Sequence, residues 1–231
     1  MPFLIILIMG VILMVSSQKL VAAEEFDFEK TVCGAVREPL AFWLWQSMAG
    51  RPDAAHVELK QNVQPIQFIA RDGVILRGYK LAARAPRGYI LVAQGNAMLA
   101  DQLISDLELF RENRFDVYLY DYRGYGKSEG KSRLAAIITD YADIISHLNT
   151  RGYTRRFMYG ISIGGVMLLN AVGRSHNFDA AVIDSSPSYI SNYGCPETYN
   201  PMRHLPQDSS HIMIISDVCA ISLLVRYKWR N

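Results

Sequence analysis

The sequence predicts an α/β protein built on a doubly wound, mainly parallel β-sheet. Short apolar runs without polar alternation recur along the chain, as expected of strands that are covered on both faces. Segments with helical spacing of apolar residues alternate with these runs, which favours parallel strands with helices on both sides. The runs are Tyr89–Ala93, Val117–Tyr120, Ala180–Ile183 and Ile212–Ile215.

Half of the 231 residues are hydrophobic, which is enough to bury one sizeable core. The net charge of +2 gives no support for a nucleic-acid partner. No cluster of His and Cys has the spacing of a zinc site, so we expect neither a metal nor another cofactor.

The chain begins with an uninterrupted apolar run from Phe3 to Val15, and small residues follow at Val21 and Ala23. The run is short for a membrane span, and the small residues suit cleavage before Glu24. We therefore expect residues 1–23 to be a signal peptide and the chain to be exported, either periplasmic or secreted. No Lys or Arg precedes the run, so an uncleaved N-terminal anchor stays open as the alternative and would be the only contact with a membrane.

Residues 24–62 predict a helical extension before the main domain. Its clearest element is the aromatic stretch Leu40–Met48, which is expected to form a helix that packs on the body or lies at a membrane surface. Gly50–Asp53 breaks the chain after this helix.

Residues 63–216 hold the predicted core. Ile66–Ala70 and Val74–Leu81 flank Asp72-Gly73, and Asp-Gly between apolar runs is a hairpin signal. Strands and helices then alternate to Ile215, with helices expected at Leu99–Arg111, Leu134–Leu148 and Val166–Val172.

Gly160-Ile161-Ser162-Ile163-Gly164 lies between a predicted strand and a predicted helix. A Gly-x-Ser-x-Gly in this context is the nucleophile-elbow pattern, in which a sharp turn lifts the serine hydroxyl above the sheet edge. The alternative interpretation is a glycine-rich connection that carries a surface serine.

Two further stretches accompany this elbow: Gln94-Gly95-Asn96-Ala97 and Asp121–Gly130. Together the three stretches resemble the α/β-hydrolase fold, and within it the serine-hydrolase branch with bacterial esterase-like and serine-aminopeptidase-like members. The resemblance implies a serine hydrolase that acts on a small-molecule carboxylic ester or amide.

Carried over residue by residue, the resemblance makes Ser162 the nucleophile. The backbone N–H groups of Ile163 and Asn96 become the donors to the oxyanion. Gln94 stands where relatives usually have a histidine, and it can still orient the loop by hydrogen bonding. Asp121 and Arg123 are expected to brace the loops around the elbow and to take no part in the chemistry.

A phosphate-binding P-loop is the competing interpretation of Gly124–Ser128. That motif needs a glycine five residues before Gly126, and Asp121 occupies the position. A carboxylate there would repel phosphate, so nucleotide binding is not expected.

A serine hydrolase of this family also needs an acid and a histidine, which complete a catalytic triad with the serine, and these two residues are harder to place. In the family an acid follows the seventh strand and a histidine follows the eighth, yet no histidine occurs after His211 and Asp217 stands early for the acid. The matching pattern stops near Ser216, as in a truncated or frameshifted gene, so the fold is expected to lack its last strand and helix and residues 217–231 to be a non-matching tail. Activity is then expected to be impaired.

Asp184 and His204 follow Ser162 in the chain order acid, then histidine, so the three residues are a candidate variant triad. The alternative interpretation is that neither residue is catalytic: Asp184 is a hydrogen-bonding residue at a strand end, and His204 is a loop residue. A non-catalytic binding or interaction protein on a hydrolase scaffold is the alternative function.

Three cysteines occur, at positions 33, 195 and 219. If the chain is exported, Cys33 and Cys195 can pair in an oxidising compartment. The other reading is that all three are free, small apolar residues.

Overall fold

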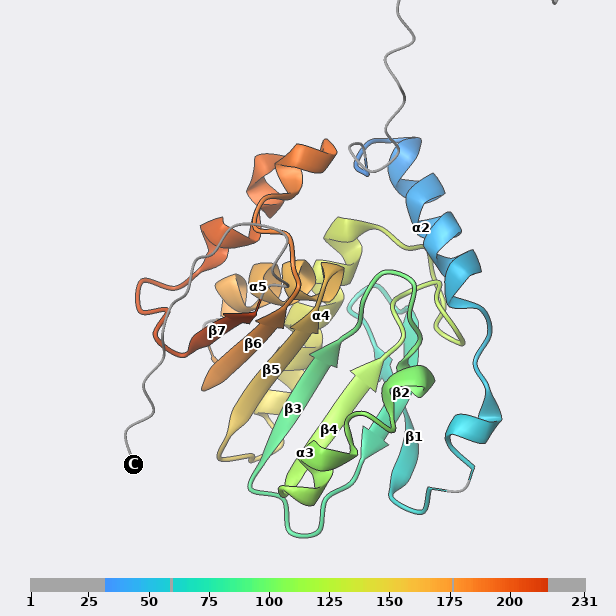
Figure 1. Cartoon of the computed structure of the whole chain (residues 1–231), viewed down its shortest axis with the longest axis vertical. Helices are drawn as coiled ribbons and strands as arrows, with labels where there is room; N and C mark the ends of the chain where they lie inside the picture. The colour runs from blue at the N-terminus through green and yellow to red at the C-terminus, as the bar shows by residue number, and fades with distance from the viewer. Residues whose placement is uncertain (1–31, 59, 176, 216–231) are drawn as a thin grey trace, which may run out of the picture.

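The computed structural model describes residues 32–215 except 59 and 176. Within these residues one seven-stranded sheet has the order β1-β2-β4-β3-β5-β6-β7 (Figure 1). The hairpin strands β1 and β2 are antiparallel, β2 joins β4 antiparallel, and every other neighbouring pair is parallel. The predicted fold class is confirmed. The strands are β1 Val63–Ile69, β2 Ile75–Leu81, β3 Gly88–Ala93, β4 Phe115–Tyr120, β5 Arg156–Ile161, β6 Ala180–Asp184 and β7 Ile212–Ile215.

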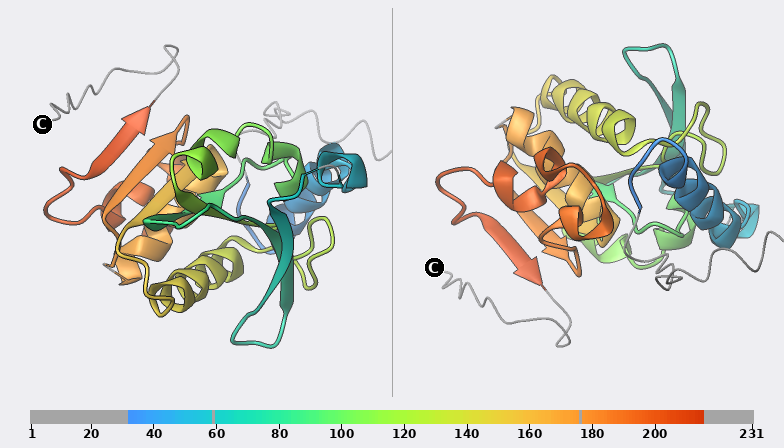
Figure 2. Two further views of the ribbon diagram at one scale, coloured as in Figure 1. Left: turned by 90° about the horizontal axis from the view of Figure 1, so that it is seen from below. Right: turned by 90° about the horizontal axis from the view of Figure 1, so that it is seen from above.

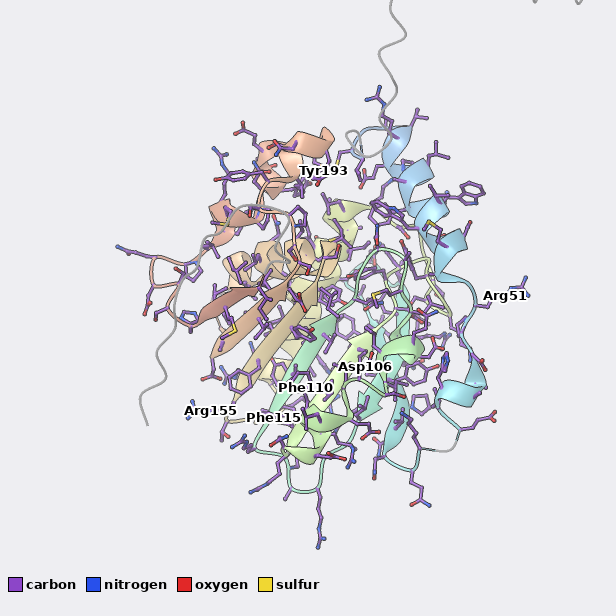
Figure 3. All side chains as sticks on the ribbon, in the orientation of Figure 1. Arg51, Asp106, Phe110, Phe115, Arg155 and Tyr193 are labelled. Atoms are coloured by element: carbon purple, nitrogen blue, oxygen red, sulfur yellow. A yellow bond between two sulfur atoms is a disulfide. The ribbon has the colours of Figure 1, made fainter. Side chains whose placement is uncertain are left out.

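Helices cover both faces of this sheet, which is why the central strands are apolar without alternation (Figure 2). On one face α4 (Leu134–Asn149) and α5 (Ile163–Ser175) enclose the larger core cluster. On the other face η3 (Ala100–Leu103) and α3 (Glu108–Glu112) enclose a smaller one. Phe110 and Phe115 belong to this second layer, where their rings meet Tyr159 and Phe157 (Figure 3).

The predicted helix over Leu99–Arg111 is wrong as a single element. A 3₁₀ turn at η3 and the short α3 replace it, with turns between them. Most backbone bonds in this stretch reach the third residue back: the N–H of Ile104 donates to the carbonyl of Asp101 and that of Phe110 to the carbonyl of Leu107. Asp121 accepts from the N–H of Ala100 at 2.8 Å, and Gln102 accepts from the N–H of Leu99 at 3.0 Å, so these two side chains cap the first turn.

The predicted aromatic helix is α2 (Arg37–Ala49), and it packs on the body. Its neighbour η2 (Ala54–His56) leads into β1. Three short 3₁₀ turns lie in the long loop after β6: η4 (Ile190–Tyr193), η5 (Glu197–Tyr199) and η6 (Pro201–His204). Cys33 and Cys195 form a disulfide that ties the start of α2 to this loop. The residues predicted as signal peptide and as C-terminal tail lie outside the described part of the chain.

Candidate active site

Ser162 lies at the turn from β5 into α5 with φ of 52°. This left-handed backbone is uncommon for a residue with a side chain. The flanking glycines are required by space: a Cβ on Gly160 would lie 2.6 Å from Cα of Gly165, and a Cβ on Gly164 would lie 2.1 Å from the carbonyl oxygen of Ala93. The strand, the turn and the helix therefore have the geometry of a nucleophile elbow.

The neighbouring chain holds this turn from several sides. The N–H of Ser162 donates to the carbonyl of Asp184 at 2.8 Å, and its own carbonyl accepts from the N–H of Gly165 at 3.0 Å and from Oγ of Ser186 at 2.5 Å. Strained backbone persists where the surroundings over-determine it. The loop after β6 thus fixes the turn, a contribution that the sequence analysis did not anticipate.

The loop after β3 runs beside Ser162. A Cβ on Gly95 would lie 3.9 Å from Cβ of Ser162, so the backbone there approaches the serine closely. Within the described residues no hydrogen bond uses the N–H of Asn96 or that of Ile163, the first residue of α5. Helix N-termini leave such donors free. Both N–H groups therefore have no hydrogen-bond acceptor among the described residues, and their role as oxyanion donors stays a prediction.

Three side chains fix the path of that loop. Gln94 is fully buried, and its Nε2 donates to the carbonyl of Tyr120 at 3.0 Å. The hydroxyl of Tyr122 donates to the carbonyl of Gln94 at 2.5 Å, and the hydroxyl of Tyr125 donates to the carbonyl of Asn96 at 2.9 Å. Gln94 therefore orients the loop as expected. The two tyrosines were missed as supports although they lie in the stretch Asp121–Gly130 that the sequence singled out.

Asp121 and Arg123 brace the loops, as predicted. Burial raises the pKa of Asp121 to about 6, partly offset by the N–H of Ala100. Arg123 is buried and forms an ion pair with Asp140 on α4, its Nε donating at 2.7 Å, and a second one with Asp72 at 2.9 Å. Arg123 thus joins the loop after β4 to α4 and to the β1–β2 turn.

Within the described residues neither the Asp184 carboxylate nor the His204 ring hydrogen-bonds to Ser162, although the backbone carbonyl of Asp184 accepts from the N–H of Ser162. Asp184 accepts from the hydroxyl of Tyr159 at 3.0 Å, on the sheet face that α3 covers; burial and this bond raise the pKa of Tyr159 to about 12. His204 packs on the other face, where its Cβ would lie 2.7 Å from a Cβ on Gly173 of α5. Its Nε2 contacts the carbonyl of Thr198 at 2.7 Å. Because strand side chains alternate between faces, the sheet separates the two residues.

The other described histidines also have partners away from the elbow. His56 Nδ1 lies 2.7 Å from Oδ2 of Asp101, His147 contacts Arg151, and the ring of His211 packs on Phe178. Among the residues that the structure describes, no histidine hydrogen-bonds to Ser162. His176 and Asp217 lie outside those residues.

The described chain holds no group of three or more His, Cys, Asp or Glu side chains that could bind a metal ion. No described helix is both long enough and apolar enough to cross a membrane.

The comparisons with known proteins agree with this geometry. The sequence model of the hydrolase family described as serine aminopeptidase, S33, matches residues 84–212, which is more than half of the chain. The chain belongs to this family. The match covers β3 to the start of β7, and thus the elbow and both loops that approach it.

Individual relatives align with about half of this chain. YfhR of Escherichia coli strain K12 is 28% identical over 135 residues, 54% of this chain and 48% of YfhR. A thiohydrolase of Eupenicillium brefeldianum is 27% identical over 116 residues, 47% of this chain and 38% of that protein. The chain thus spans about half the length, or less, of these relatives. Among solved structures, the Pyrococcus furiosus esterase Pf2001 has a TM-score of 0.51 and 20% identity, covering 61% of this chain and 54% of that one; this likeness concerns the α/β-hydrolase fold.

Proposed function

We propose that this chain is a serine hydrolase that attacks a small-molecule carboxylic ester or amide by nucleophilic acyl transfer. The observation that carries the proposal is the left-handed backbone of Ser162 at the β5–α5 turn, with two uncommitted backbone N–H groups beside it. Membership of a hydrolase family and the printed name of the thiohydrolase relative support acyl chemistry.

In the proposed reaction Oγ of Ser162 bonds to the carbonyl carbon of the substrate, and the carbonyl π electrons move to its oxygen. The N–H groups of Ile163 and Asn96 stabilise the resulting oxyanion. The tetrahedral intermediate collapses as the alcohol or amine leaves with the proton from Oγ, and water then hydrolyses the acyl-serine. Both steps need a base, and no described histidine is hydrogen-bonded to Ser162. We therefore expect turnover by this chain to be slow.

A non-catalytic binding protein on the same scaffold is the second candidate. The sheet separates the side chains of Asp184 and His204, which are the acid and the base of the candidate variant triad. This separation favours the binding protein. Such a protein would bind an acyl compound at the elbow and leave it intact.

A fluorophosphonate probe separates the two candidates, because it phosphonylates only an activated serine. We expect slow labelling of the full chain, loss of labelling in Ser162→Ala, and the wild-type rate of labelling in Ser146→Ala, which changes an exposed serine on α4. Circular dichroism checks that each variant is folded. Folded wild-type protein that resists the probe would overturn the enzymatic proposal and leave the binding protein.

We also propose that the chain is exported. The disulfide between Cys33 and Cys195 supports this location, because such bonds persist in oxidising compartments. Thiol labelling of cell fractions tests it: the two cysteines should be unreactive in an exported fraction. A cytoplasmic pool with both thiols reactive would contradict the proposal.

A further inference from the structure

The outward face of α2 is a continuous apolar stripe. Its members recur at helical spacing, each three or four residues from another, and all are exposed. They are Val36 (77% exposed), Leu40 (43%), Trp43 (61%), Leu44 (39%) and Met48 (65%). Contiguous exposed apolar surface on a helix marks a contact that the folded chain itself does not satisfy.

The inward face of α2 is firmly attached, so the stripe cannot turn into the protein. Phe42 is buried. Gln46 donates to Ser132 at 2.6 Å, Glu38 accepts from the N–H of Leu134 at 2.6 Å, and the carbonyl of Ala49 accepts from Gln102 at 2.9 Å. The helix runs along the side of the molecule (Figure 1), and Trp43 and its apolar neighbours are exposed on it.

We propose that this stripe, which we call the α2 stripe, docks onto the surface of a lipid bilayer. The charges around it favour a membrane over a protein partner. Arg51 follows the helix, is exposed and points away from the body (Figure 3). The only carboxylate on α2, Glu38, is engaged with the body. A tryptophan amid aliphatic side chains with an exposed arginine after the helix suits the headgroup region of an anionic bilayer.

The chain that precedes the described residues supplies the second argument. Residues 1–31 lead directly into α2 and contain the apolar run Phe3–Val15. Where the run is kept as the uncleaved anchor, the 16 residues from Ser16 to Thr31 can reach at most about 55 Å, so the run and the α2 stripe can contact the same bilayer. A run of 13 residues is a weak anchor by itself, and two linked contacts bind far more tightly than either one.

Vesicle co-sedimentation of the full chain tests the proposal, with mixed phosphatidylcholine and phosphatidylglycerol vesicles. The double variant Trp43→Gln, Leu44→Gln should bind roughly tenfold or more weakly, because it removes two apolar side chains from the contact. The matched control is Ile69→Gln, Leu109→Gln, whose side chains are at least as exposed as those of Trp43 and Leu44 but lie on β1 and α3. We expect the control to bind like wild type.

A second measurement reports the contact directly. Brominated phosphatidylcholine should quench wild-type tryptophan fluorescence, and Trp43→Phe should lose most of this quenching while it stays folded, since only Trp45 and Trp229 remain. Equal vesicle binding by wild type and the stripe variant, or unchanged quenching in Trp43→Phe, would overturn the proposal. So would a concentration-dependent dimer without lipid that the stripe variant abolishes, because a second copy would then cover the stripe.

Discussion

Ser162 shows how a single backbone angle is maintained at a residue that does not favour it. A left-handed conformation costs an L-residue about 1–2 kcal/mol. The surrounding glycines let β3, β5 and α5 approach closely: a Cβ on Gly164 would lie only 2.1 Å from the carbonyl oxygen of Ala93. Ser162 itself stays partly exposed, while the glycines behind it are tightly packed.

Gly164→Ala should therefore destabilise the fold by about 3 kcal/mol, since backbone atoms of β3 must move. Gly152→Ala is the control: nothing lies within 4 Å of its Cβ position, and its φ of 75° costs about 1 kcal/mol. Urea unfolding of both variants measures the difference. Equal losses would show that the close approach at Gly164 is not restrictive.

Asp121 gives the fold a pH dependence of defined sign. Burial raises its pKa from 3.8 to about 6, so between these values the folded state holds a proton that the unfolded state releases. The contribution of this group to the free energy of unfolding is largest below about pH 4. It decreases by about 3 kcal/mol as the pH rises to 6 and above.

Asp121→Asn removes that titration. The stability of wild type relative to the variant should be greater at pH 4.5 than at pH 7.5, by about 2–3 kcal/mol in urea melts. A relative stability that does not change between the two pH values would mean that Asp121 is ionised in the folded state throughout.

At the scale of elements, strands were predictable and short helices were not. The runs Tyr89–Ala93 in β3 and Val117–Tyr120 in β4 are apolar throughout and buried, a pattern that burial on both faces dictates locally. The start of η3 is capped by Asp121, which is distant in sequence. His204 likewise packs on Gly173, and nothing near His204 indicates that neighbour. Local chemistry therefore predicts the elbow, whereas the surroundings of its partners depend on tertiary packing.

Arg123 allows a test of how α4 is held. Asp140 and Asp72 contact the same guanidinium, but the Asp140 side chain is 2% exposed and the Asp72 side chain 48%. Asp140→Ala should cost about 3–5 kcal/mol because it leaves a buried charge short of its main partner. Asp72→Ala should cost less than about 1 kcal/mol because solvent already screens that pair. Thermal or urea unfolding of the two variants measures the difference. Similar losses of stability in both would contradict the claim that the buried Arg123–Asp140 pair holds α4 in place.

At the scale of the whole molecule, the two segments that border the upper edge of the sheet are joined to each other. The disulfide links Cys33, before α2, to Cys195, after η4, and the N–H of Val32 donates to the carbonyl of Tyr193 at 2.6 Å (Figures 1 and 3). The carboxyl ends of the parallel strands, where Ser162 lies, point toward this edge. A link between α2 and the loop after β6 therefore constrains both sides of the site.

Removing this link should destabilise the chain and loosen the site together. The bond closes a loop between residues 162 positions apart, and loss of a native disulfide costs about 2–5 kcal/mol, chiefly because the unfolded chain regains freedom. The double variant Cys33→Ser, Cys195→Ser should melt at a lower temperature than wild type. Dithiothreitol should lower the wild-type melting temperature to that of the variant and leave the variant unchanged, because Cys219 has no part in the bond. A reductant effect of equal size on both proteins would show that the stabilisation comes from elsewhere.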